Sequence, residues 1–82
     1  MAKRTANEAY QRNRGDIEGL LDLLREEVTH AAEHARNDGV NWAHVGSMAH
    51  VREGLVETLA FLARQDEAFI EKRLAAVRRG RK

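Results

Sequence analysis

The sequence of 82 residues contains no cysteine and no proline, and its aromatic residues are one tryptophan, one tyrosine and two phenylalanines. Without cysteine, neither a disulfide framework nor a thiolate metal site can reinforce so small a domain. The absence of proline, together with few β-branched or aromatic clusters, favours helix over strand. We therefore expect an all-α protein in a reducing, cytoplasmic compartment.

Long apolar runs are also missing, since the chain offers only short ones such as AFLA at residues 60–63. Residues 1–16 contain no apolar stretch after their basic residues, so we expect neither a signal peptide nor a membrane span. A single domain over residues 1–82 is expected, and a domain of this length hides a smaller fraction of its surface than a larger one. Packing between helices or between copies must supplement its thin core.

Acidic and basic residues are unevenly distributed along the chain, although the formal net charge is only +1. Residues 1–14 carry four basic residues against one acid, and residues 72–82 carry six basic residues and no acid. Residues 15–71 carry four arginines against twelve acids. Both ends of the chain are therefore basic and its centre is acidic.

A first helix is predicted over residues 5–37. Thr5 and Glu8 have the spacing of a capping box, in which each side chain satisfies a backbone N–H of the first turn. Apolar residues then recur in one helical phase at Tyr10, Ile17, Leu21, Leu24, Val28, Ala31 and Ala35. Gly15 and Gly19 weaken this helix without predicting a break. Residues 37–39 are expected to end this helix, because glycine readily adopts the left-handed conformation found at helix C-termini.

After a turn over residues 38–41, a second long helix is predicted over residues 42–79 with a short basic tail at 80–82. Asn41 is its expected N-cap. Its apolar residues are Val45, Met48, Ala49, Leu55, Val56, Leu59, Leu62, Ala63, Phe69, Ile70, Leu74 and Val77. Two long helices joined by a short turn predict an antiparallel helical hairpin.

Two helices alone leave much of each apolar stripe in water, so we expect two hairpins to associate into a homodimeric four-helix bundle. Arg52 and Asp66 lie at equal distances from Leu59 within the apolar sector of the second helix. If Leu59 lies on the two-fold axis, Arg52 of each chain faces Asp66 of the other. The alternative is that the charged groups of both side chains extend beyond the edge of the apolar stripe into water. The predicted dimer interface comprises Arg52, Leu55, Leu59, Leu62 and Asp66.

The four histidines do not predict a metal site. His30 and His34 have the i,i+4 spacing of helical metal ligands, and His44 is the only other histidine on a flank from which it could join them. There is no HExxH motif and no Glu-x-x-His pair on both helices. No carboxylate pair stands isolated in an apolar setting. We therefore expect no metal, no cofactor, no catalytic residue and no enzymatic activity.

The remaining patterns suggest two functions. Phe61 on the second helix and Leu20 and Leu23 on the first widen the apolar surface beyond the main stripes. This pattern is typical of a homodimeric interaction or regulatory module, of bacterial type, which could also bind a protein partner.

The alternative function is that of a nucleic-acid-binding accessory protein, because a hairpin would bring both basic chain ends to one pole. The candidate phosphate contacts are Lys3, Arg4, Arg12, Arg14, Lys72, Arg73, Arg78, Arg79, Arg81 and Lys82. These residues could equally form a solvated tail, with some cations favourably placed at a helix C-terminus.

Overall fold

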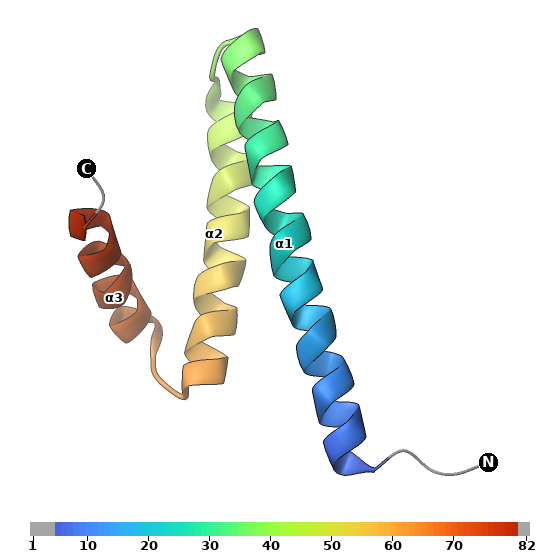
Figure 1. Cartoon of the computed structure of the whole chain (residues 1–82). Coiled ribbons are helices and arrows are strands. Elements are labelled where there is room, and N and C mark those ends of the chain that lie inside the picture. The colour runs from blue at the N-terminus through green and yellow to red at the C-terminus, as the bar shows by residue number, and fades with distance from the viewer. Residues whose placement is uncertain (1–4, 81–82) are drawn as a thin grey trace. The chain divides into compact units, whose positions relative to one another are not determined.

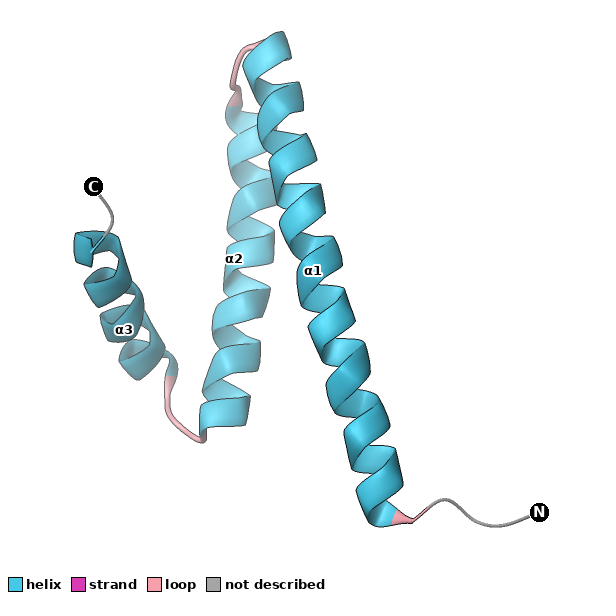
Figure 2. Ribbon diagram, in the orientation of Figure 1, coloured by secondary structure: helices cyan, strands magenta, loops and turns pink. Residues whose placement is uncertain are grey.

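The computed structural model describes residues 5–80, and these residues form three α-helices (Figures 1 and 2). Helix α1 spans Ala6–Asp38, α2 spans Trp42–Ala63 and α3 spans Glu67–Gly80. The predicted all-α class is confirmed. The chain divides into two compact units, Met1–Gly39 and Val40–Lys82.

Helix α1 begins at the predicted capping box. The Glu8 N–H donates to the Thr5 hydroxyl oxygen at 3.1 Å, and the Thr5 N–H donates to the Glu8 carboxylate at 2.9 Å. The hydrogen bond from the Thr5 N–H, followed by hydrogen bonding with the Thr5 hydroxyl, holds the pKa of Glu8 below its ordinary value, because both stabilise the ionised carboxylate. The helix then continues without interruption through Gly15 and Gly19. It ends at Gly39, whose φ of 84° is a conformation that L side chains rarely adopt.

Helix α2 begins at the predicted N-cap, Asn41. Its side-chain oxygen accepts hydrogen bonds from the N–H groups of Ala43 at 2.9 Å and His44 at 3.1 Å. The His44 ring completes a reciprocal cap, because its Nδ1 accepts from the Asn41 N–H at 3.1 Å. A histidine three residues after the cap thus takes the place that Glu or Gln usually occupies in a capping box.

The prediction of one continuous helix over residues 42–79 is wrong, and so is a hairpin of only two helices. The chain turns at residues 64–66 between α2 and α3. Arg64 has φ 58° and ψ 43°, which is the left-handed helical region. Its N–H donates to the Phe61 carbonyl at 3.3 Å, and the Gln65 N–H donates to the Ala60 carbonyl at 3.0 Å. These bonds form a Schellman motif in which arginine occupies the position that glycine usually takes, at a cost of about 1–2 kcal/mol for an L-residue.

Asp66 starts the third helix. Its side-chain oxygen accepts from the Phe69 N–H at 2.9 Å, which satisfies one of the free donors of the first turn. The backbone of Asp66 also accepts from the Ile70 N–H at 3.4 Å. A Schellman stop followed directly by an Asp cap therefore explains a break within a segment, residues 55–79, that contains neither glycine nor proline.

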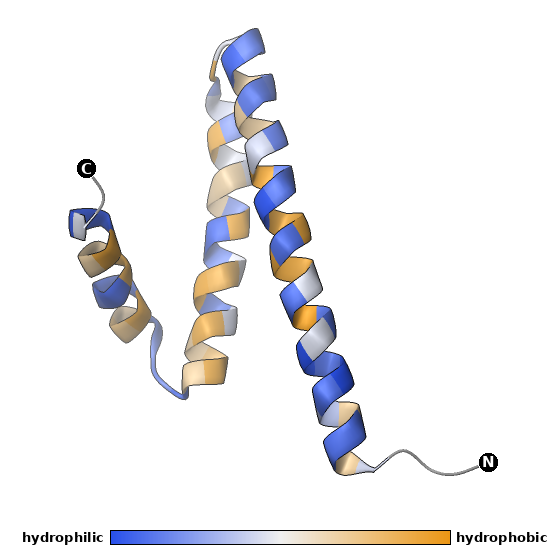
Figure 3. Ribbon diagram, viewed as in Figure 1, coloured by the Kyte–Doolittle hydropathy of each residue, from blue (hydrophilic) through white to orange (hydrophobic). Residues whose placement is uncertain are grey.

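The core of the second unit forms where α3 returns against α2. It consists of Val56 and Ala60 on α2 and Ile70 on α3, which are 6%, 8% and 5% exposed. Helix α1 contributes no buried residue. Figure 3 shows that apolar residues occupy much of α2, whereas the ends of α1 are hydrophilic. None of the helices within residues 5–80 is long and apolar enough to cross a lipid bilayer.

Candidate functional site

The most organised polar contact between two elements joins Arg52 on α2 to Glu71 on α3. Arg52 Nη1 donates to Glu71 Oε2 at 2.9 Å, and Nη2 donates to Oε1, so the pair is bidentate. Paired N–H groups that meet both carboxylate oxygens give the geometry in which Arg–carboxylate contacts are strongest. Glu71 directly follows the core residue Ile70, and Arg52 lies about one turn from Val56. The pair therefore lies beside the small core.

Each member of the pair stabilises the charged form of the other. Hydrogen bonding to Arg52, and then the attraction of its charge, hold the pKa of Glu71 below its ordinary value, with a smaller contribution from Arg78. The pKa of Arg52 is raised by the same hydrogen bonds and by the negative charge of Glu71. Both side chains remain 44% exposed, so water screens the attraction and the contact is weaker than a buried pair.

The predicted dimer contact between Arg52 and Asp66 was derived for a continuous second helix. In this structure Arg52 binds Glu71, and Asp66 caps α3. Sequence reasoning missed Glu71 because it lies 19 residues from Arg52, beyond any local helical spacing. A signal for Asp66 was present, since an Asp three residues before Phe69 has the spacing of an N-cap. The dimer interface as a whole stays a prediction.

An uncovered apolar stripe, defined here as Met48, Leu55, Leu59 and Leu62, runs along α2 beside the face that α3 covers. Its members follow one another at spacings of seven, four and three residues, so they share one side of the helix. Leu59 is 51% exposed and Leu62 is 73% exposed. Three of the predicted interface leucines thus lie together on an accessible surface.

Other large apolar side chains are exposed on both units. On α1, the predicted stripe residues Tyr10, Ile17, Leu21 and Val28 are all exposed, as are Leu20 and Leu23. On α2, Phe61 is 84% exposed, and its helical position lies opposite Leu59. Scattered exposed apolar residues are ordinary, but stripes that follow a helical period indicate surfaces that pack against a partner element.

The predicted phosphate contacts fall on separate parts of the molecule. Four of them, Lys3, Arg4, Arg81 and Lys82, lie outside the described residues. In the first unit, Arg14 forms an ion pair with Glu18 at 3.6 Å. Within residues 5–80, none of the four basic residues of α3 forms an ion pair; these are Lys72, Arg73, Arg78 and Arg79. The meeting of both chain ends at one pole stays a prediction.

The histidines make local contacts. His30 Nδ1 lies 3.8 Å from Glu27, and His34 Nδ1 lies 3.9 Å from Asp38 on the same helix. His44 belongs to the other unit, and its Nδ1 is engaged in the cap of α2. No group of three or more histidine, aspartate or glutamate side chains within residues 5–80 is arranged to hold a metal ion.

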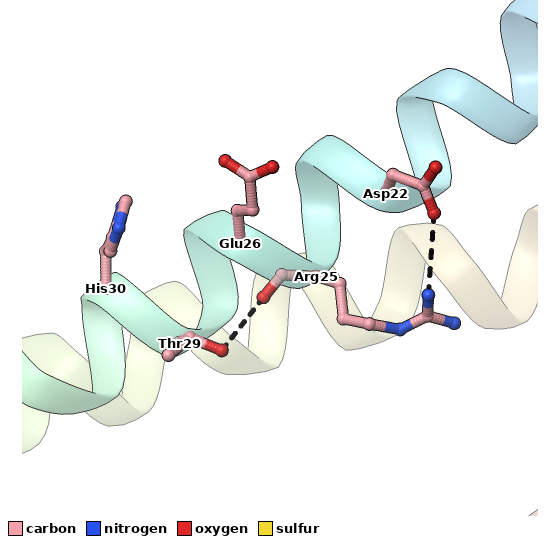
Figure 4. Close-up of a pocket in the computed structure, with 5 residues that line it drawn as sticks. All are labelled: Asp22, Arg25, Glu26, Thr29 and His30. Carbon is pink, nitrogen blue, oxygen red and sulfur yellow. Dashed lines mark hydrogen bonds and ion pairs between the residues drawn. The ribbon is translucent and has the colours of Figure 1, made fainter.

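A shallow groove on α1 is lined by Asp22, Arg25, Glu26, Thr29 and His30 (Figure 4). Its contacts are those of ordinary helix surface. Arg25 pairs with Asp22 at 3.6 Å, and the Thr29 hydroxyl donates to the Arg25 carbonyl at 3.1 Å. Figure 4 shows Glu26 and His30 projecting on the same side of the helix. These i,i+3 and i,i+4 pairs modestly stabilise an isolated helix and hold no arrangement of a nucleophile with a base.

Comparisons with protein-family models, with curated proteins and with solved structures find no match to this chain.

Proposed function

We propose that this chain is a small, non-enzymatic helical protein that acts as a homodimeric interaction module. The observation that carries the proposal is the imbalance between covered and uncovered apolar surface. Only Val56, Ala60 and Ile70 are buried, whereas sixteen large apolar side chains within residues 5–80 are exposed. A core of three residues gives a domain of this size little hydrophobic stabilisation. Association with a second copy supplies what the single chain lacks.

The uncovered apolar stripe of α2 is the proposed centre of the interface. A two-fold dimer brings the same surface of each copy together, so a self-complementary apolar stripe suits it well. Leu55, Leu59 and Leu62 would be covered by helices of the second copy, as apolar stripes are in a helix bundle. The stripe of α1, from Tyr10 to Ala35, would supply the remaining helix faces of a four-helix bundle.

Two measurements test the dimer. Light scattering should give twice the mass of one chain, and the melting temperature should rise with protein concentration, because folding is coupled to association. Leu59→Glu should abolish the dimer, since it places a charge within the apolar interface. His50→Glu is a matched control, because it adds the same charge on the opposite side of the same helix. A dimer that survives Leu59→Glu would show that the interface lies elsewhere.

The second candidate function is nucleic-acid binding through α3. Its supporting observation is that the four basic residues of α3 form no ion pair within the described residues, which favours contact of their charges with phosphates. Binding to duplex DNA and to structured RNA should then weaken steeply with salt. Arg73→Glu should reduce that salt dependence, whereas Arg25→Glu on α1 makes the same change of charge away from α3. Absence of binding at low salt would reject this candidate.

A further inference from the structure

The turn between α2 and α3 is short and rests on a residue poorly suited to it. It has three residues, Arg64 to Asp66, and the left-handed position is held by arginine instead of glycine. Short hinge loops under strain favour the exchange of an element between copies. Hydrogen bonds from Arg64 and Gln65 to the end of α2 hold the turn in its present form.

The same segment also has the sequence of a continuous helix. No glycine or proline occurs in residues 55–79, and the apolar period predicts a single helix through the turn. Straightening would move Arg64 into the right-handed region and would replace the turn hydrogen bonds with ordinary helical ones. It would also separate Ile70 from Val56 and Ala60 and would break the Arg52–Glu71 pair, so a straight chain needs a substitute for these contacts.

A second copy provides that substitute, because the surface that α3 vacates on one chain fits α3 of the other. Apolar fit and charge complementarity are both present in the contact that the single chain forms, with Ile70 against α2 and Glu71 against Arg52. In a two-fold arrangement each α2 receives the partner copy's α3, so neither copy is left with an open face.

We propose that the dimer forms by exchange of α3, with α2 and α3 of each copy joined into one straight helix that packs antiparallel against the same helix of the second copy. The interchain contacts would then repeat those of the single chain, and Arg52 would bind Glu71 of the second copy. The two-fold axis would fall midway between residues 52 and 71, beside Leu62, instead of at Leu59. This inference rests on the proposed homodimer and specifies how its copies meet.

Complementary charge variants distinguish exchange from a contact within one chain. Arg52→Glu and Glu71→Arg each place like charges together in any homodimer or monomer, and each should lower the melting temperature. If α3 is exchanged, unfolding and refolding the two variants together should restore the wild-type melting temperature, because both interchain pairs of the mixed dimer are again complementary. The double variant R52E/E71R is the control, since it restores the pair in either arrangement. If the double variant restores the wild-type melting temperature but the mixture does not, the pair forms within one chain and the exchange is excluded.

A distance measurement tests the straight helix without relying on the strength of that pair. Nitroxide labels at His50→Cys and Ala76→Cys of one chain, diluted with unlabelled chain, report only the separation within a chain, and the chain has no other cysteine. The labelled positions are 26 residues apart, which corresponds to about 39 Å in a straight helix at about 1.5 Å per residue. The dimer should show this long distance. A dimer with only a much shorter distance would exclude exchange while keeping the homodimer, whereas a monomeric mass at all concentrations would reject the homodimer itself.

Discussion

The guanidinium of Arg52 on α2 donates two hydrogen bonds to the carboxylate of Glu71 on α3, and this pair flanks the contact of Ile70 with Val56 and Ala60. The two helices are thus joined both by an apolar contact and by an ion pair next to it. A bidentate pair has a narrow range of geometry, so this contact favours one position of α3 along α2.

Acid should weaken the contact between α2 and α3. The pKa of Glu71 in the folded chain lies below its ordinary value of 4.5, chiefly because Arg52 donates hydrogen bonds to the ionised carboxylate. A carboxylate with a lowered folded-state pKa stabilises the fold fully above its unfolded pKa, and this contribution is lost as the pH falls through the folded pKa. The loss should therefore begin near pH 4.5 and continue below it.

The measurement is the melting temperature from pH 7 to pH 2.5 for the wild-type chain and for Glu71→Gln. Subtracting the two curves isolates Glu71 from the other carboxylates, including Glu8, whose pKa is also lowered. The wild-type advantage over Glu71→Gln should be largest at neutral pH and should shrink below about pH 4.5. A difference that stays constant over this range would show that the charge of Glu71 does not stabilise the contact.

Truncation of Ile70 should be the most damaging single change in the second unit. The side chain is 5% exposed and is the only buried contribution from α3 within the described residues. Ile70→Ala should lower the free energy of unfolding by about 2–3 kcal/mol, the lower part of the range for buried aliphatic truncations. Val77→Ala on the same helix is the control, since Val77 is 49% exposed. Urea denaturation followed by circular dichroism would measure both, and equal effects would contradict the assigned core.

Two substitutions of glycine by alanine should change stability in opposite directions. Gly39 has φ 84°, so Gly39→Ala forces a strained conformation at the end of α1 and should cost about 1–3 kcal/mol. Gly15 lies inside α1, where an added Cβ meets nothing within 4 Å. Gly15→Ala should therefore stabilise the helix by up to about 1 kcal/mol. Helicity and urea denaturation of both variants would test this, and loss of stability in Gly15→Ala would indicate that a partner approaches α1 closely at that position.

The turn residues should control the balance between the folded-back chain and the proposed exchanged dimer. Arg64→Gly favours the left-handed turn and disfavours a straight helix, so the dimer should dissociate at a higher concentration than in the wild type. Asp66→Ala removes the cap of α3, worth about 1 kcal/mol, and improves helix propensity, so it should strengthen the dimer. Sedimentation equilibrium would measure both dissociation constants. Equal shifts in the same direction would contradict a role for the turn.

Local chemistry made both ends of α1 and the start of α2 predictable from the sequence. The capping box at Thr5 and Glu8, the stop at Gly39 and the cap at Asn41 each depend on residues within one turn of one another, and all three are present. The break at residues 64–66 was missed because apolar periodicity continues through it and because arginine gives no sign that it will adopt a left-handed conformation. The Asp66 cap was the available signal, but its position within the apolar sector favoured an interface role instead.

Contacts between residues far apart in the sequence were harder to predict from the sequence. The choice of Glu71 as the partner of Arg52 follows from the return of α3, so no spacing along the chain reveals it. The leucines of the uncovered stripe share one side of α2 because they follow its helical period, which the sequence already displays. Helix periodicity does not determine what covers them, because packing against a second copy depends on association.

Sedimentation equilibrium of the wild-type chain over a wide concentration range tests the central claim most directly. The proposal predicts that the mass rises from that of one chain at high dilution to twice that value, and that Leu59→Glu remains at the mass of one chain throughout. A wild-type mass of one chain at every concentration would contradict the homodimer.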